Sequence, residues 1–284
     1  MTFNISSKLA YNVQSSGTLI LSTQCMQTSG QIVSNESFTT SREVDYQELS
    51  LGLGGNRFSR IALEKGGPLE IDYTAEVKTS YQLVDRSDID ENDTGHIPPE
   101  AIPFLFPSRY CESDALRQEA AELFPNQQSQ YEKVEAIVDW VHKNVEYVSG
   151  STGELTSAAD VIEGKQGVCR DFAHLCIALC RALCIPARYA TVYAYKLEPQ
   201  DFHAVFEVYI GHAWFMFDAT HLAPLNGLVR ISSGRDAADT AVASVYGAIQ
   251  GSQPPEVSCE IAEENFEPVT RKSLKEQQKA FILL

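Results

Sequence analysis

The sequence lacks a surplus of positive charge. Its 284 residues include 22 lysines and arginines against 38 aspartates and glutamates, which gives a formal net charge of −16. Nucleic acids and anionic membrane surfaces repel an acidic protein surface, so we expect neither a nucleic-acid partner nor a membrane partner. The same charge keeps a protein soluble.

Long apolar runs are also missing. The longest one, residues 175–183, is interrupted by Arg181 and is too short to cross a bilayer. The first residues show no basic segment followed by an apolar run, which is the pattern of a secretory signal. We therefore expect a soluble cytoplasmic protein.

Two common binding motifs are absent. No pair of cysteines has the CxxC spacing of a zinc site, so we expect no metal. The glycine-rich segment 52–55 lies in a strand-like region with no helix after it, which is not the context of a phosphate-binding loop, and we expect no cofactor. The seven cysteines are an odd number in a chain too large to depend on disulfides, which favours reduced thiols.

The chain changes its pattern near residue 100. Residues 3–83 form short alternating segments, separated by Ser-Gly and Gly-Gly turns, which predict an N-terminal antiparallel β-sandwich over 1–100. The acidic, turn-rich segment 85–99 is typical of a linker or an exposed loop. Residues 101–284 then form a second domain.

The second domain begins with helical periodicity and continues with strands. Helices are predicted up to residue 123, over 129–145 and over 169–185. Strands are predicted over 188–196, 203–210, 213–218 and 256–266, and the terminal segment 270–284 is predicted to be docked or frayed. This order, with helices packed on an antiparallel sheet, predicts an α+β fold.

Cys169 opens the third of these helices. At about 100° per residue, Cys176, Cys180 and Cys184 fall within roughly 60° of the direction of Cys169, so we interpret these three as core packing. Cys169 differs from them because it lies in the first helical turn. A thiol there meets free backbone N–H groups and the positive end of the helix dipole, which favour a thiolate nucleophile.

A base and its orienting carboxylate lie downstream. His203 begins one predicted strand and Asp218 ends the next, and an antiparallel hairpin places these two positions side by side. His212 is the competing base, but it lies in the Gly211-His212 turn at the opposite end of the hairpin. The order Cys169, His203, Asp218 is that of a nucleophile, a base and an orienting group.

These residues also carry a family resemblance. The segments GVCRDFAHL, ALCRALCIPARY, HAVFEVY and FDAT resemble the core of the transglutaminase-like superfamily, whose fold is that of the papain-like cysteine peptidases. PSRYC and LVRISSGRDAADTA resemble the bacterial branch with an N-terminal β-domain. The resemblance implies that Cys169, His203 and Asp218 form the catalytic triad. His221, directly after FDAT, departs from the pattern, and we expect it to line the cleft.

Further site residues are candidates only. The Gln166 amide could donate to an oxyanion, although the backbone N–H of Cys169 is better fixed by the start of the helix. Arg170 could favour the thiolate or bind substrate. Tyr147, Trp140 and Trp214 are interpreted as core aromatics.

The sequence thus predicts a cysteine-dependent acyl-transfer enzyme that cleaves amide bonds of a peptide or protein through a thioester. A peptidase or amidase is favoured, because no feature marks an amine-binding site. A transamidating, protein cross-linking enzyme and a non-catalytic interaction module on the same fold are the alternatives. The cleft could also be covered by the β-domain or by the loop 220–235.

Overall fold

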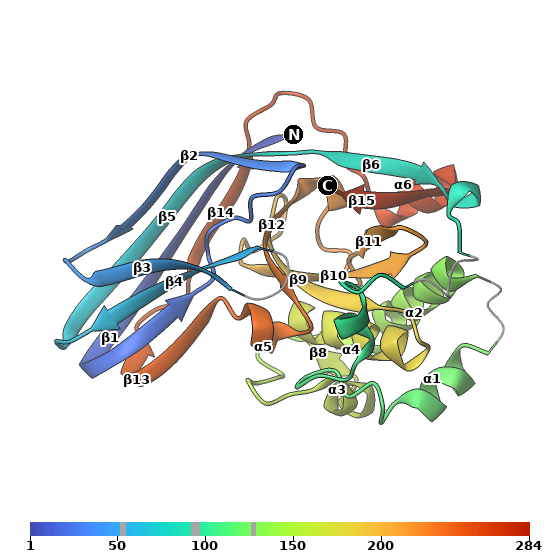
Figure 1. Cartoon of the computed structure of the whole chain (residues 1–284), viewed down its shortest axis with the longest axis horizontal. Coiled ribbons are helices and arrows are strands. Elements are labelled where there is room, and N and C mark those ends of the chain that lie inside the picture. Colours follow the sequence, from blue (N-terminus) through green and yellow to red (C-terminus); the bar gives the residue numbers. More distant parts are fainter. Residues whose placement is uncertain (52–54, 92–96, 126–128) are drawn as a thin grey trace.

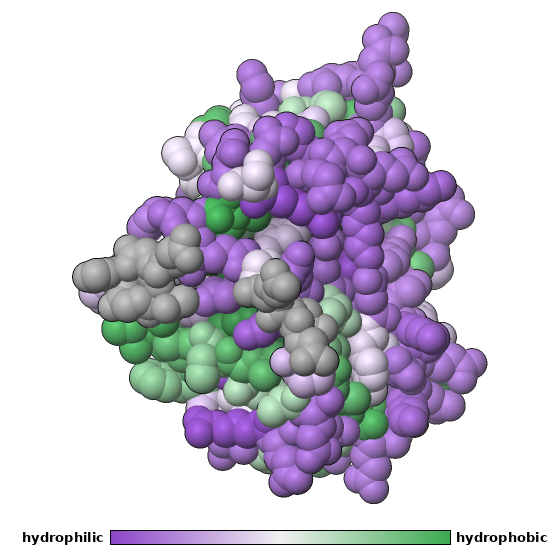
Figure 2. Space-filling view, turned by 90° about the vertical axis from the view of Figure 1, so that its right-hand side faces the viewer, coloured by the Kyte–Doolittle hydropathy of each residue, from purple (hydrophilic) through white to green (hydrophobic). Residues whose placement is uncertain are grey.

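The computed structural model describes residues 1–51, 55–91, 97–125 and 129–284, so parts of the glycine-rich segment and of the acidic segment lie outside the described ranges. A curved antiparallel sheet occupies one side of the molecule and the helices gather on the other, with a smaller antiparallel sheet between them (Figure 1). This arrangement confirms the α+β class. From the helical side, the surface is mostly hydrophilic with one apolar area (Figure 2).

The N-terminal strands alternate between inward and outward side chains. In β5, Leu69, Ile71 and Tyr73 are buried and the residues between them are more exposed. This period of two buries one face of a strand and is the reason these segments form a sheet. The strands are β1 (Thr2–Leu21), β2 (Gln31–Thr40), β3 (Asp45–Leu51), β4 (Asn56–Leu63), β5 (Gly67–Thr79) and β6 (Tyr81–Asp85).

Strand β1 is paired on both edges. Its first part lies between β5 and β14 (Glu256–Ile261), and its last part lies between β4 and β13 (Ala243–Gly251). The pairing shifts by a bulge between Val13 and Gly17. Two strands from the C-terminal part of the chain therefore complete the N-terminal sheet. The division into 1–100 and 101–284 stays a prediction, and the sheet draws on both segments.

The helical part is built around α4, in which residues 172–180 are all buried. A helix that is buried on every side has to lie at the centre of its domain. The helices are α1 (Arg117–Leu123), α2 (Gln130–Asn144), α3 (Ala158–Gly164), α4 (Cys169–Ala182), α5 (Ala237–Thr240) and α6 (Arg271–Gln277), with short 3₁₀ turns at η1 (Arg86–Asp88), η2 (Ile102–Leu105) and η3 (Leu225–Gly227). Over the described ranges, no helix is long and apolar enough to span a bilayer.

The smaller sheet has four antiparallel strands in the order β11-β10-β9-β12. They are β9 (Ala187–Ala194), β10 (His203–Ile210), β11 (Ala213–Phe217) and β12 (Leu228–Gly234). Two short strands, β7 (Glu146–Tyr147) and β8 (Gln166–Gly167), pair in parallel beside α4. The C-terminal strand β15 (Lys279–Leu283) pairs with β6, so the end of the chain is docked.

The end of α4 corrects one expectation from the sequence. The helix stops at Ala182, and Cys184 has a left-handed backbone with φ of 62° and is exposed. A left-handed residue after a helix turns the chain away from the helical path, so helical spacing no longer describes where its side chain points. The interpretation of Cys184 as core packing is therefore wrong, whereas Cys176 and Cys180 are buried as expected.

A buried carboxylate joins three strands of the smaller sheet. Glu207 on β10 is fully buried and accepts hydrogen bonds from Arg188 on β9, at 2.7 Å, and from Arg230 on β12. Burial alone would raise the pKa of Glu207, but the two guanidinium charges lower it. Both oxygens of the carboxylate are thus paired in the interior.

We expect Glu207→Ala to lower the free energy of unfolding by about 3–5 kcal/mol, because it leaves buried Arg230 and largely buried Arg188 without their shared partner. Urea denaturation of the full chain measures this change. The control is Glu276→Ala, which removes only an exposed partner of Lys272 at 4.0 Å and should leave the midpoint unchanged. A Glu207→Ala loss no larger than that of the control would show that the charge network does not hold the sheet.

Candidate active site

Cys169 is the first residue of α4. Val168 before it is extended, and its N–H donates to the Asp171 carboxylate at 2.9 Å, so Asp171 caps the helix from inside. Gly167 permits this tight entry, because a β-carbon there would come within 2.7 Å of the Asp171 side chain. Cys169 is half-buried, whereas Cys176 and Cys180 are buried. The nucleophile candidate therefore lies at the N-terminal end of α4, where the helix leaves the core.

His203 and Asp218 meet as the hairpin predicts. His203 is the first residue of β10, and Asp218 directly follows β11. The His203 Nε2 and Asp218 Oδ2 atoms are 2.9 Å apart, and both side chains are buried. This contact leaves Nδ1 as the ring nitrogen that is free for the sulfur of Cys169. The competing base His212 lies in the turn beyond the Ile210–Ala213 pair, at the other end of the hairpin.

Thr220 holds the Asp218 carboxylate in place, a role that sequence reasoning missed. Oδ1 of Asp218 accepts hydrogen bonds from the Thr220 backbone N–H at 2.8 Å and from its hydroxyl at 2.6 Å. Burial alone would raise the pKa of Asp218, but the His203 charge and these hydrogen bonds lower it. The carboxylate is therefore ionised and oriented.

The pKa of the His203 imidazole depends on both of its neighbours, Asp218 and Cys169. Burial alone would lower the pKa of His203, but the charge and hydrogen bond of Asp218, together with a hydrogen bond to the Cys169 side chain, raise it to about 10. The structure thus brings Cys169, His203 and Asp218 into one continuous set of contacts. At neutral pH the imidazole holds a proton beside an ionised carboxylate.

Tyr147 also reaches Cys169, which corrects its interpretation as a core aromatic. Its side chain is 46% exposed, and it lies on β7 opposite Gly167 of β8. Its hydroxyl lies beside the backbone and the side chain of Cys169, and burial together with the Cys169 charge raises the pKa of Tyr147 to about 12. No sequence spacing indicated this contact, because it depends on the pairing of two-residue strands.

Cys169 lines a cavity of about 640 Å³, whose wall also includes the first residues of strand β13. His203 and Arg170 line this cavity, and Arg170 also donates to the Gly153 carbonyl at 2.7 Å. Gln166 is exposed on β8 and is not among the lining residues. Much of the rest of the wall consists of small uncharged side chains, including Ala204, Ala237, Ala238, Ala241, Ala243 and Ser244.

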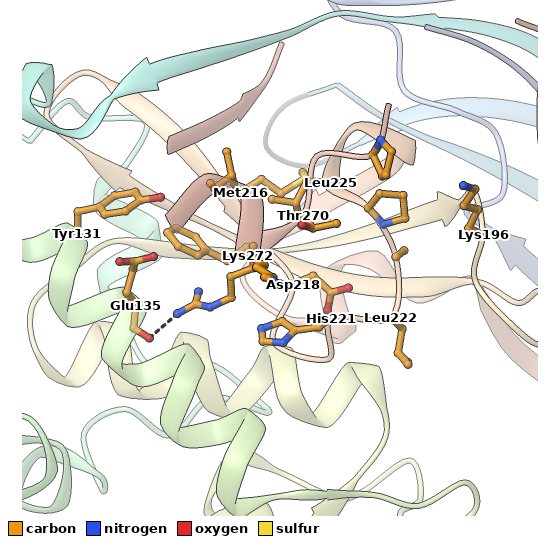
Figure 3. Close-up of a pocket in the computed structure, with 16 residues that line it drawn as sticks. Tyr131, Glu135, Lys196, Met216, Asp218, His221, Leu222, Leu225, Thr270 and Lys272 are labelled. Carbon is orange, nitrogen blue, oxygen red and sulfur yellow. Dashed lines mark hydrogen bonds between the residues drawn. The ribbon is translucent and has the colours of Figure 1, made fainter. Parts of the chain in front are cut away.

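Asp218 lines a second cavity, of about 380 Å³ (Figure 3). His221 lines that cavity and not the one that contains Cys169, so the expectation that it lines the cleft is wrong. Its left-handed backbone, with φ of 57°, turns the ring onto His142, and the two ring centroids are 4.0 Å apart. Burial and the neighbouring His142 lower the pKa of His221 to about 4.

Known proteins resemble both parts of the chain. A family description of the bacterial transglutaminase N-terminal domain matches residues 1–96, and one of the transglutaminase-like superfamily core matches residues 117–219. A crystal structure from Cytophaga hutchinsonii, called a "putative cysteine protease", is 45% identical with a TM-score of 0.95, and the match covers 100% of this chain and 98% of that one. The chain belongs to the transglutaminase-like superfamily.

Two mycobacterial proteins match over a shorter region. An uncharacterised protein of Mycobacterium leprae is 30% identical over 117 residues, which are 38% of this chain and 42% of that protein. An uncharacterised protein of Mycobacterium tuberculosis is 31% identical over 102 residues, 36% of this chain and 32% of that protein. The chain thus matches less than half the length of these mycobacterial relatives.

The raised pKa of His203 predicts how the free energy of unfolding depends on pH. Since its folded value is raised above the ordinary 6.5, the pair with Asp218 stabilises the fold fully below about pH 6.5, and this contribution is lost as the pH rises toward 10. We expect the difference in unfolding free energy between the parent and Asp218→Asn to shrink over that range, by at most about 1.4 kcal/mol per pH unit.

The measurement is urea denaturation at several pH values between 6 and 9.5. Both proteins should carry Cys169→Ala, so that the thiol does not titrate. If the difference in unfolding free energy between the two proteins stays constant across this range, His203 does not hold its proton in the folded protein as proposed.

Proposed function

We propose that this chain is a cysteine-dependent enzyme that transfers the acyl group of an amide to water. The observation that carries the proposal is the half-buried Cys169 at the start of α4, in contact with a buried His203–Asp218 pair. A thiol, a base and an orienting carboxylate in contact are what nucleophilic catalysis requires. The name given to the Cytophaga relative, "putative cysteine protease", supports the same reaction class.

The first half-reaction forms a thioester. The Cys169 sulfur attacks the carbonyl carbon of the amide, and His203 carries the proton of the thiol. The carbon–nitrogen bond then breaks, and His203 gives that proton to the leaving amine. A histidine whose pKa is about 10 holds a proton at neutral pH and is ready for this donation.

The second half-reaction restores the enzyme. Water loses a proton to His203 and attacks the thioester carbon, and the carbon–sulfur bond breaks to give a carboxylic acid and the free thiol. In both halves the carbonyl oxygen becomes negative. The backbone N–H of Cys169, which the Tyr147 hydroxyl faces in the structure, is the donor proposed for it.

Exposed Cys184 provides an internal control for the reactivity of Cys169. At pH 7 we expect iodoacetamide to alkylate the half-buried Cys169 at least about tenfold faster than the more exposed Cys184, because the thiolate is the reacting species. Peptide mapping by mass spectrometry measures both rates in one sample. His203→Asn should slow alkylation of Cys169 alone, and equal rates at the two cysteines would rule out an activated nucleophile.

Turnover gives the direct test. The parent chain should release new amino termini from unfolded casein, Cys169→Ala should release none, and His203→Ala should lower the rate by about 10² to 10⁴. Cys184→Ala should behave as the parent. A fluorescent primary amine in the same assay reports the alternative, since its incorporation into casein in preference to hydrolysis would identify a transamidating enzyme. Turnover that survives Cys169→Ala would refute the proposed nucleophile.

A further inference from the structure

Strand β13 brings an edge of the large sheet to the nucleophile. Its first residues, Ala243 to Tyr246, line the same cavity as Cys169 and His203. Within the described ranges β13 pairs with β1 alone, so its other edge has no strand partner. Figure 1 shows β13 at the border of the large sheet, next to α5 of the helical part.

The register of β13 with β1 shows which backbone groups of β13 face that open edge. The N–H of Ser22 donates to the carbonyl of Val242 at 2.9 Å, and the pairing continues in the same register. Because hydrogen-bonded pairs alternate along antiparallel strands, Ser244 and Tyr246 also bond toward β1. The Tyr246 carbonyl oxygen indeed lies 2.6 Å from where a β-carbon of Gly17 would be. Ala243 and Val245 therefore direct their N–H and C=O groups away from β1.

This edge also lacks the charges that protect the other edges of the sheet. Edge strands usually carry charged residues or proline, which prevent further strands from adding. Three outer strands of the same sheet carry glutamate or aspartate, namely β2, β3 and β14. Strand β13, with the sequence ASVYGAIQG, has neither a charge nor a proline. Val245 and Tyr246 are 40% and 60% exposed, although the chain carries a net charge of −16.

We propose that a substrate binds as an extended peptide that adds to the open edge of β13, with its main chain hydrogen-bonded to Ala243 and Val245. This inference rests on the proposed function, and it adds the class of substrate. An added strand gains its affinity from main-chain hydrogen bonds, as peptides do on other sheet edges. Four residues of such a strand span about 13 Å. The cavity of about 640 Å³ has room for its backbone.

Pairing with the open edge of β13 restricts which substrates the enzyme can cleave. The cleaved amide has to belong to an unfolded or flexible segment, because a segment already paired in a sheet or wound in a helix has no free N–H and C=O groups to offer. Substrate side chains meet a mixed wall, in which alanine, serine and threonine lie beside the aromatic rings of Tyr110, Tyr189, Phe202 and Tyr246. A small amide without neighbouring peptide groups should react poorly.

The test compares two electrophiles on the full chain. One is iodoacetamide, and the other is a six-residue alanine–valine peptide that carries an iodoacetyl group; each forms a carbon–sulfur bond with Cys169 and releases iodide. We expect Val245→Pro, which removes an outward N–H, to lower the ratio of the peptide rate to the iodoacetamide rate by roughly tenfold, since it removes one hydrogen bond and obstructs the edge.

The matched control is Val257→Pro on β14. The N–H of Ala262 donates to the carbonyl of Thr2, so by the same alternation Val257 also faces away from β1, on an edge strand that does not line the cavity. This variant should keep the parent ratio. An equal fall in both variants, or no fall in Val245→Pro, would overturn strand addition.

Modified peptides test the same idea without relying on the folding of a variant. A strand uses every second N–H for pairing, so N-methylation of one alternate set of residues should abolish the rate advantage of the peptide, and methylation of the other set should not. Equal effects of the two sets would overturn the inference. If iodoacetamide itself fails to single out Cys169, the proposed function falls, and the inference falls with it.

Discussion

The antiparallel pairing of β10 with β11 is the constraint on which the site depends. It places His203, at the start of one strand, beside Asp218, after the end of the next, and the resulting contact is buried. Buried charges need partners, and here each has one: His203 pairs with Asp218, whose second oxygen is held by Thr220. The helix α4 then has only to deliver one thiol to the free side of the imidazole.

The same sheet is held together by a second buried set of charges. Glu207 lies four residues after His203 on β10 and pairs with arginines of the two flanking sequence segments, Arg188 and Arg230. This network ties β10 to its neighbour β9 and to β12 beyond it, so the strand that carries the base is anchored on the side that faces away from β11. The position of His203 therefore depends on the charges of Glu207, Arg188 and Arg230, which lie outside the cavity that contains Cys169.

The large sheet contributes to the site through the far end of the chain. Strand β1 is shared by β5 and β14 along its first part and by β4 and β13 along its last part. Residues after 240 consequently return to the N-terminal sheet, and on the way they form one wall of the Cys169 cavity. Because the large sheet forms part of this wall, it affects which substrate segments can reach Cys169.

Local patterns alone determined much of this protein. Alternation of apolar residues predicted the N-terminal strands, helical periodicity predicted α2 and α4, and the spacing of His203 and Asp218 in a hairpin predicted their contact. These inferences succeed because each depends on neighbours within one element or one tight turn. The family motifs added the superfamily, which the comparisons confirm.

Only the tertiary structure decided the rest. Cys184 left the buried stripe because the helix ended before it, and His221 faced a second cavity because its backbone is left-handed. Tyr147 reached Cys169 through the pairing of β7 with β8, and β13 reached the cavity through its pairing with β1. Each of these contacts joins segments far apart in the chain or follows a change of backbone direction, and periodicity within one segment carries no information about either.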